Sequence, residues 1–190
     1  NSPTRTNLCV GVYSYTITDA LFCTRTGTVS ITQPPATTIT VVRNNLTCFG
    51  LCNGSATVNI AGGTLPHSFT WTPAPPSGQG TSTITNLCAG TYSASITDGN
   101  GCPSSTVVTV TQPASITPNI STVQPTCNGL CNGSITSAPT GGVGAFTFTL
   151  QSSTATITTN PPYNALCAGS YTLLINNNGC TTTNTINLTQ

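Results

Sequence analysis

The chain has 190 residues, and only 3% of them carry a charged side chain, compared with about 25% in an average soluble protein. Three basic residues, two acidic residues and one histidine give a net charge of +1, which excludes the basic surface that binds nucleic acid. No apolar run reaches the roughly 18 residues of a transmembrane helix, so we expect no membrane insertion by this segment. No signal peptide is visible, and any export signal is expected outside these residues or already removed.

Ten cysteines in this chain indicate an oxidising compartment, because disulfides form and persist outside the cytosol. We therefore predict an extracellular protein. Structural zinc is the alternative, but zinc sites usually have paired short spacings such as C-x2-C. Here the only close pair in the complete unit is Cys48 and Cys52, with the spacing C-x3-C. The sequence thus predicts disulfides, and neither a metal site nor a cofactor.

The cysteines also mark a repeat. Cys9, Cys88 and Cys167 are spaced 79 residues apart, and the text around them reads NLCVGVY, NLCAGTY and ALCAGSY. Prolines at positions 34, 35 and 113 stand between the repeats and predict short, semi-rigid joints. Three domains are predicted: 1–34, the C-terminal part of a repeat; 35–113, a complete repeat; and 114–190, a second complete repeat.

The first unit contains two predicted strands. Apolar side chains occupy alternate positions from Tyr13 to Ile17, and again at Val29 and Ile31. A period of two is typical of a strand that turns one face towards a core. The positions between them hold mostly Thr, Ser and other polar residues, and threonine favours extended backbone because it is branched at Cβ.

The complete repeats place further strands ahead of this pair. In 35–113 one strand begins at Ala56 and another carries Phe69 and Trp71, and the third unit has Leu150 in place of the tryptophan. Six or seven short strands per repeat, separated by turn residues, predict an immunoglobulin-like β-sandwich. Trp71 would be the buried aromatic residue of its third strand. The predicted fold class is therefore all-β, with tandem, disulfide-stapled immunoglobulin-like domains.

Two turn motifs support this fold. The segment Gly90–Tyr92 resembles a tyrosine corner at the entry to the next-to-last strand. The segment Asp98–Gly101 predicts a hairpin turn, because its glycines accept a positive φ. Asp98 and its counterpart Asp19 are interpreted as turn caps and not as calcium ligands, since calcium needs several oxygen ligands.

The pairing of the cysteines is constrained by strand length. Cys88 and Cys102 lie at opposite ends of a predicted strand, farther apart than the roughly 7 Å that a disulfide allows between Cα atoms. Each is therefore expected to bond with one member of the close pair, Cys48 and Cys52. Two connectivities remain open: Cys48–Cys102 with Cys52–Cys88, or Cys48–Cys88 with Cys52–Cys102.

Cys9 and Cys23 occupy the positions that Cys88 and Cys102 have in the next repeat. Their partners are therefore expected outside the given residues, upstream of Asn1, as in a chain cut from a longer array. An intermolecular disulfide in a polymer is the alternative.

The motifs between residues 48 and 113 resemble a known family. They read C-x-G-x-C-N-G-S-A-T-V, G-G-T-x-P, F-T-W, N-L-C-A-G-T-Y, I-T-D-x-x-G-C and V-T-V-T-Q-P, and in combination they are similar to the SprB repeat. That repeat occurs in gliding-motility adhesins and other surface proteins of Bacteroidota, which are exported by the type IX secretion system. The resemblance implies a long bacterial cell-surface protein with structural or adhesive work.

The resemblance also bears on the disulfides. The family has a two-cysteine form that keeps the first and the last cysteine position. This form implies the following bonds in the two complete repeats: Cys48–Cys102, Cys52–Cys88, Cys127–Cys180 and Cys131–Cys167.

We predict a structural segment of an extracellular filament or stalk, with copies of itself or further repeats of the same chain as partners. No catalytic set of residues is present, so an enzyme is not expected. The alternative is an adhesin or carbohydrate-binding module that contacts surface glycans, with Tyr163 and Phe49 as exposed aromatic candidates. His67, the single histidine, is interpreted as a loop residue.

Overall fold

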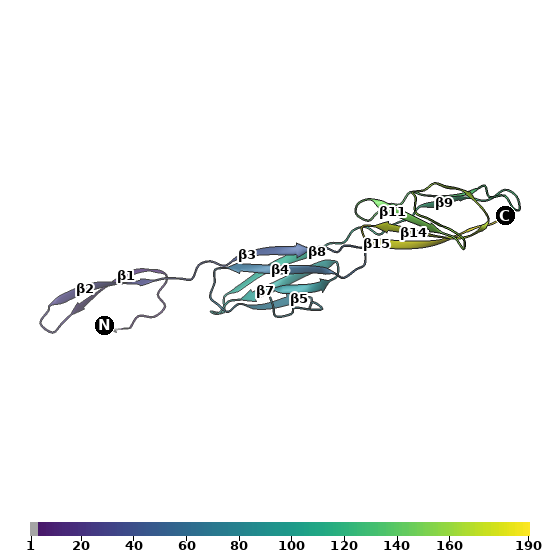
Figure 1. Cartoon of the computed structure of the whole chain (residues 1–190). Coiled ribbons are helices and arrows are strands. Elements are labelled where there is room, and N and C mark those ends of the chain that lie inside the picture. Colours follow the sequence, from purple (N-terminus) through teal and green to yellow (C-terminus); the bar gives the residue numbers. More distant parts are fainter. Residues whose placement is uncertain (1–3) are drawn as a thin grey trace.

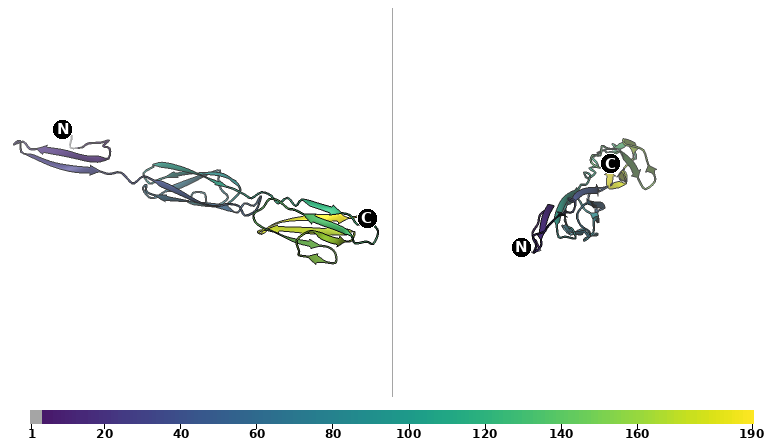
Figure 2. Two further views of the ribbon diagram at one scale, coloured as in Figure 1. Left: turned by 90° about the horizontal axis from the view of Figure 1, so that it is seen from above. Right: turned by 90° about the vertical axis from the view of Figure 1, so that its left-hand side faces the viewer.

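The computed structural model describes residues 4–190, which form strands and no helix, so the predicted all-β class is confirmed. Three bodies follow one another end to end, from the N-terminal hairpin to the C-terminal sandwich (Figure 1). Views from above and along the length show the same order (Figure 2). Over the described residues there is no helix with the length and apolarity to cross a membrane.

The first body is an antiparallel hairpin of β1 (Gly11–Thr18) and β2 (Thr24–Ile31). Its residues alternate as predicted, but within residues 4–190 no second sheet covers the apolar face. Ile17 is 62% exposed, whereas its counterpart Ile96 in the middle body is 1% exposed. The hairpin therefore presents to solvent the face that the complete bodies bury.

The middle body is a sandwich of two three-stranded antiparallel sheets, β3-β4-β6 and β5-β7-β8. This order matches the A-B-E and C-F-G sheets of an immunoglobulin-like domain, so the predicted domain type is confirmed by topology. Its strands are β3 (Thr38–Asn44), β4 (Gly54–Ala61), β5 (Ser68–Thr72), β6 (Thr83–Leu87), β7 (Gly90–Thr97) and β8 (Pro103–Val110).

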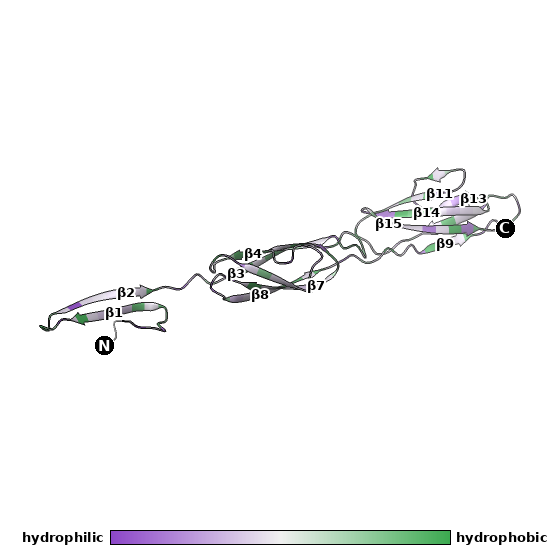
Figure 3. Ribbon diagram, turned by 90° about the horizontal axis from the view of Figure 1, so that it is seen from below, coloured by the Kyte–Doolittle hydropathy of each residue, from purple (hydrophilic) through white to green (hydrophobic). Residues whose placement is uncertain are grey.

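The core of this sandwich is built from alternate residues of both sheets. Hydrophobic and hydrophilic stretches are accordingly interspersed along the strands (Figure 3). Trp71 on β5 is buried at its centre, and its indole N–H donates to the carbonyl oxygen of Thr81 at 2.9 Å. The large apolar surface is thus buried without leaving its one polar atom unpaired. Ile84 and Ile96 from the two facing sheets are buried in the same cluster.

The third body repeats this plan with one addition. Its sheets have the orders β9-β10-β13 and β12-β11-β14-β15, so β12 is an extra edge strand formed by the Thr-rich segment that follows β11. A second, separate core fills it, with Leu150 buried where the middle body has Trp71. Its strands are β9 (Ile120–Val123), β10 (Gly133–Ser137), β11 (Phe146–Gln151), β12 (Thr156–Ile157), β13 (Tyr163–Leu166), β14 (Gly169–Asn177) and β15 (Cys180–Leu188).

A tyrosine corner recurs in all three bodies. In each, a tyrosine near the start of the next-to-last strand donates its hydroxyl proton to a carbonyl four residues upstream, as the Gly90–Tyr92 motif predicts. The three bonds are Tyr13 to Cys9 at 2.9 Å, Tyr92 to Cys88 at 3.1 Å and Tyr171 to Cys167 at 2.9 Å.

Candidate functional site

Each complete sandwich contains one internal disulfide at its C-terminal end. Cys52 precedes β4 and Cys88 follows β6, and these strands pair with Gly54 opposite Leu87. The strand register therefore brings the two sulfur atoms together. Both internal bonds are among the expected pairs: Cys52–Cys88 and Cys131–Cys167.

Two predicted bonds are wrong, Cys48–Cys102 and Cys127–Cys180. Cys102 lies in the turn after β7, a strand of eight residues that spans about 25 Å, and Cys88 precedes that strand. Cys48 is four residues from Cys52, and Cys52 is held at the Cys88 end. Such a short loop cannot reach both ends of β7. The length of β7, which keeps Cys88 and Cys102 apart, therefore keeps Cys48 and Cys102 apart as well.

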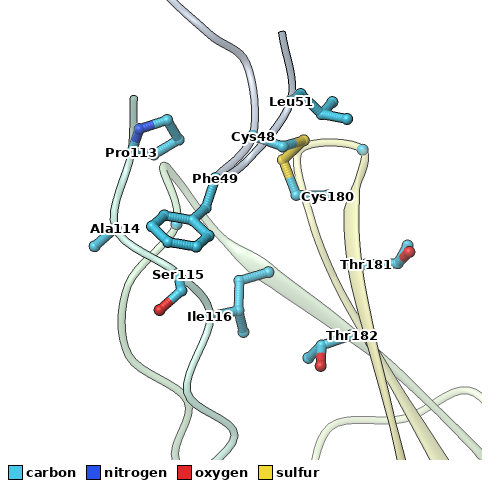
Figure 4. A pocket seen from close by; sticks show the side chains of 12 residues that line it. Cys48, Phe49, Leu51, Pro113, Ala114, Ser115, Ile116, Cys180, Thr181 and Thr182 are labelled. Atoms are coloured by element: carbon cyan, nitrogen blue, oxygen red, sulfur yellow. A yellow bond between two sulfur atoms is a disulfide. The ribbon is translucent and has the colours of Figure 1, made fainter. Parts of the chain in front are cut away.

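Cys48 instead bonds with Cys180 of the third body, across 132 residues of sequence (Figure 4). The two Cα atoms are 5.6 Å apart, inside the usual range for a disulfide. Cys48 lies in the loop that precedes β4, and Cys180 begins β15 at the end of the third body that faces the middle body. We call this bond the joint disulfide, because it connects one repeat to the next in addition to the polypeptide linker.

The cysteine loop, residues 47–53, is also fastened to the linker 111–119 that carries the chain across the joint. The N–H of Gly50 donates to the Oε1 of Gln112 at 2.9 Å. The linker and the joint disulfide therefore leave the middle body at the same end. Gln112 is not among the residues predicted from the sequence, although a glutamine recurs at this position of each repeat in the text T-Q.

A cavity of about 390 Å³ lies beside the joint disulfide. The ring of Phe49, from the cysteine loop, faces Ser115 and Ile116 of the linker across it (Figure 4). Phe49 remains 57% exposed. All the lining side chains are uncharged, and the two lining cysteines are bonded to each other. The joint can therefore make apolar contacts but offers no group for general acid–base chemistry.

The hairpin that carries Cys102 is held by Asp98. Its Oδ1 accepts the N–H groups of Cys102 at 2.8 Å and Asn100 at 2.9 Å, and its Oδ2 accepts the N–H of Thr64 at 3.0 Å. These backbone donors, Cys102 first, hold the pKa of Asp98 below its ordinary value because they stabilise the ionised carboxylate. Asp19 accepts two N–H bonds in the first hairpin. Both aspartates therefore act as turn caps.

The third body has Asn177 at the corresponding position. Its Oδ1 accepts the N–H of Val143, and its Nδ2 donates to the carbonyl oxygens of Gly144 at 2.9 Å and Ala145 at 3.1 Å. An amide side chain fits here because the neighbouring loop supplies both donors and acceptors. The turn is therefore held by a carboxylate in the middle body and by an amide in the third body.

The glycan-contact candidates have different surroundings. Tyr163 is only 3% exposed and donates its hydroxyl proton to the carbonyl oxygen of Thr159 at 2.7 Å, so its prediction as an exposed aromatic is wrong. Strand β13 turns it inward, and this burial raises its pKa. Phe49 is exposed, but it borders the joint cavity. His67 lies in the loop before β5, away from the joint.

Among residues 4–190, four cysteines have no partner, and all four are exposed. They are Cys9, Cys23, Cys102 and Cys127. The expectation that Cys9 and Cys23 pair outside the given residues stays a prediction.

Two segments of the chain, 40–75 and 119–155, match the family model described as SprB repeat. They cover the first three strands of each complete sandwich, and the resemblance seen in the motifs is confirmed. No curated protein sequence matches the chain.

Two solved structures resemble the chain at low identity. One is described as "Structural basis for Dscam isoform specificity", with a TM-score of 0.35 and 14% identity over 88% of this chain and 51% of that chain. The other is "Drosophila OTK, extracellular domains 3-5", with a TM-score of 0.34 and 14% identity over 94% of this chain and 70% of that chain. The chain thus spans about half the length of the Dscam structure.

Proposed function

The chain contains two SprB repeats, one in each complete sandwich, and on this premise we propose that it is a structural segment of a long extracellular filament or stalk-like cell-surface protein. Its units are 1–34, 35–113 and 114–190, and its partners are copies of itself or further repeats. The role is mechanical and not catalytic. Only two carboxylates and one histidine are available for acid–base work, and the joint cavity contains none of them.

The joint disulfide is the observation that carries this proposal. A single linker lets two domains bend and twist about each other, whereas a second covalent link restricts both motions. The linker and the bond between Cys48 and Cys180 both run from the end of one sandwich to the start of the next. Repeats that contact mainly their neighbours build length without a larger core. The two-fold connection between these two sandwiches suits a stalk that transmits force along its length.

The composition of the surface supports lateral packing of such stalks. With 3% charged residues, parallel copies would meet little electrostatic repulsion and would leave few ions to desolvate. The outward strand positions instead carry mostly uncharged polar residues, as in β8, where Ser105 and Thr109 lie on the exposed side together with Val107. Neutral hydroxyl groups can exchange hydrogen bonds between copies or with water.

Small-angle X-ray scattering and negative-stain electron microscopy of the oxidised chain test the proposal. We expect an elongated particle in dilute solution and, at high concentration, fibres whose axial repeat equals the length of one repeat. The variant Cys48→Ser/Cys180→Ser, which keeps both sandwiches but opens the joint, is expected to give a more flexible particle. A compact scattering profile, with single particles at every concentration, would contradict the proposal.

Contact with surface glycans is a second candidate, supported by the exposed ring of Phe49 beside the joint cavity. Aromatic rings exposed in this way can stack on sugars. Binding on a glycan array that is lost in Phe49→Asn would support this function, because the third body has Asn128 at the corresponding position. Equal glycan binding by the parent chain and this variant would contradict a role of Phe49 in glycan contact.

A further inference from the structure

We propose that Cys127 and Cys102 are the two halves of further joint disulfides, each equivalent to the bond between Cys48 and Cys180. Cys127 would bond with the hairpin cysteine of a following SprB-type repeat. Cys102 would bond with the loop cysteine of a preceding one. The inference rests on the proposed end-to-end stacking of repeats. It adds that one disulfide connects the two repeats at every joint.

The cysteine loop has the same construction in both complete repeats. In the middle body, Asn53 accepts the N–H of Thr47 at 3.3 Å and donates to its hydroxyl at 2.8 Å. In the third body, Asn132 accepts the N–H of Thr126 at 3.1 Å and donates to its hydroxyl at 2.9 Å. The loop therefore adopts its shape whether or not a further repeat lies beyond it.

The turn within the loop is also repeated. The N–H of Leu51 donates to the carbonyl oxygen of Cys48 at 3.4 Å, and the N–H of Leu130 donates to that of Cys127 at 3.0 Å. The amide of Gln190 in addition donates to the carbonyl oxygen of Cys127 at 3.1 Å, on the side where Gln112 fastens the first loop. Cys127 is thus held as Cys48 is, but it is exposed and unbonded.

The backbone of the hairpin cysteine is also held in place before any disulfide forms. The N–H of Cys102 is held by Asp98 at 2.8 Å, and its carbonyl accepts the N–H of Asp98 at 3.1 Å. Cys180 pairs with Asn177 at the same end of its own hairpin, although a one-residue deletion makes that turn shorter. Each hairpin therefore places its cysteine at the end of the sandwich that faces the preceding repeat.

Pairing within a repeat is not available to these thiols. Strand β14 separates the end that carries Cys127 from the end that carries Cys180, and its nine residues span about 30 Å. Cys180 is in any case already bonded to Cys48. The partner of Cys127 must therefore come from another repeat, which the same polypeptide or a second copy could supply.

Formation of each bond needs an oxidant, for which a small disulfide such as glutathione disulfide is sufficient. The Cys127 thiolate attacks one sulfur of that disulfide, forms a mixed disulfide and releases one glutathione thiolate. The hairpin thiolate of the next repeat then attacks the Cys127 sulfur and displaces the second glutathione. Two protein thiols are oxidised to one disulfide, and one glutathione disulfide is reduced to two thiols.

The test uses the full chain with residues 34–113 copied after Gln190, which restores the Gln-Pro junction of the other joints. This extended chain is folded in a glutathione redox buffer, its free thiols are blocked with N-ethylmaleimide, and it is digested with pepsin at low pH. We expect a peptide that joins Cys127 to the Cys102 sequence. Both copies of Cys102 give the same peptide, so Cys102→Ser in the original repeat assigns the bond to the added copy. Cys127 is expected to be protected from blocking in the extended chain.

Non-reducing gels identify the source of the partner. A monomeric extended chain with this bond shows pairing along one polypeptide, and a cross-linked species with the same bond shows pairing between copies. Both outcomes support the inference. In the variant Cys127→Ser, the copy of Cys102 should become open to blocking, whereas Cys9→Ser should leave the other bonds unchanged.

A blocked Cys127, or a bond between Cys127 and Cys180, would overturn the inference. The Cys52–Cys88 peptide comes from both copies, so an amount twice that of the Cys131–Cys167 peptide in the same digest shows that the added repeat has folded. If it has not, a second variant with 113–190 appended poses the same question with the hairpin that already forms a joint. If Cys127 is blocked while scattering still shows an elongated particle, a disulfide at every joint is contradicted. The proposed stalk is not contradicted by that result.

Discussion

Asp98 shows how one carboxylate organises a hairpin in a chain with almost no ionisable groups. Three backbone N–H groups converge on it and keep it ionised, so its folded-state pKa lies below that of the unfolded chain. The linkage has a definite sign. The stabilisation is fully present above the unfolded pKa and is lost as the pH falls through the folded pKa. The chain has only two carboxylate side chains, Asp19 and Asp98, so acid sensitivity is readily assigned.

We therefore expect the middle body to lose stability as the pH is lowered below the ordinary range of an aspartate. The variant Asp98→Asn should be less stable at neutral pH and should lack this acid-dependent part. Trp71 is the single tryptophan and lies in that core, so urea unfolding followed by its fluorescence reports on this body. Asp19→Asn is the matched control and should leave the fluorescence transition unchanged. The same acid dependence in Asp98→Asn and the parent would contradict the assignment.

At the scale of elements, neighbouring strands determine which cysteines meet. The internal bonds follow β4 and β6, and β10 and β13, which pair so that the cysteine before one strand adjoins the cysteine after the other. Each bond closes a loop with a sequence separation of 36 residues. A closed loop of this length restricts the unfolded chain and leaves the folded sheet unchanged.

Removal of the internal bond with Cys52→Ser/Cys88→Ser should lower the free energy of unfolding of the middle body by about 4 kcal/mol on the chain-entropy model. The measurement is the urea transition of Trp71 fluorescence. The matched variant Cys131→Ser/Cys167→Ser removes the same bond from the third body, whose core lacks tryptophan. It should leave the Trp71 transition in place. Equal shifts in both variants would mean that the two sandwiches unfold as one unit.

At the scale of the whole molecule, the joint disulfide restricts the orientation of one sandwich relative to the next. The linker 111–119 alone would allow the bodies to swing, and the bond between Cys48 and Cys180 adds a second attachment at the same interface. The two cores are separate clusters, so no shared core holds the bodies together. The orientation of one sandwich relative to the next therefore depends on covalent links more than on a shared core.

We expect Cys48→Ser/Cys180→Ser to broaden the distribution of distances between the two sandwiches. Spin labels on the exposed Cys102 and Cys127, in a background of Cys9→Ser/Cys23→Ser, lie on different bodies and can be measured by double electron–electron resonance. The parent should give a narrow distribution. The Trp71 unfolding transition should not change, because neither sandwich loses an internal contact. A narrow distribution in the joint variant would show that linker contacts such as Gly50 to Gln112 are sufficient.

Local signals in the sequence determined the repeat, the strands and the turns. The alternation around Tyr92 and Trp71, the tyrosine corner and the Asp98 turn all depend on residues close in sequence, whose pattern reflects a period-two strand with one buried face. The strand lengths left two partners open for Cys88, and the pairing of β4 with β6 in one sheet selects Cys52.

Only the tertiary structure decided the joint. The bond between Cys48 and Cys180 depends on which end of one sandwich faces which end of the next, and these ends are brought together by a linker with no periodic signal. The prediction for Tyr163 is wrong for a related reason, since β13 is too short for its pattern to show which side is buried. Sequence periodicity describes single elements, whereas a contact between repeats depends on how completed domains are placed in space.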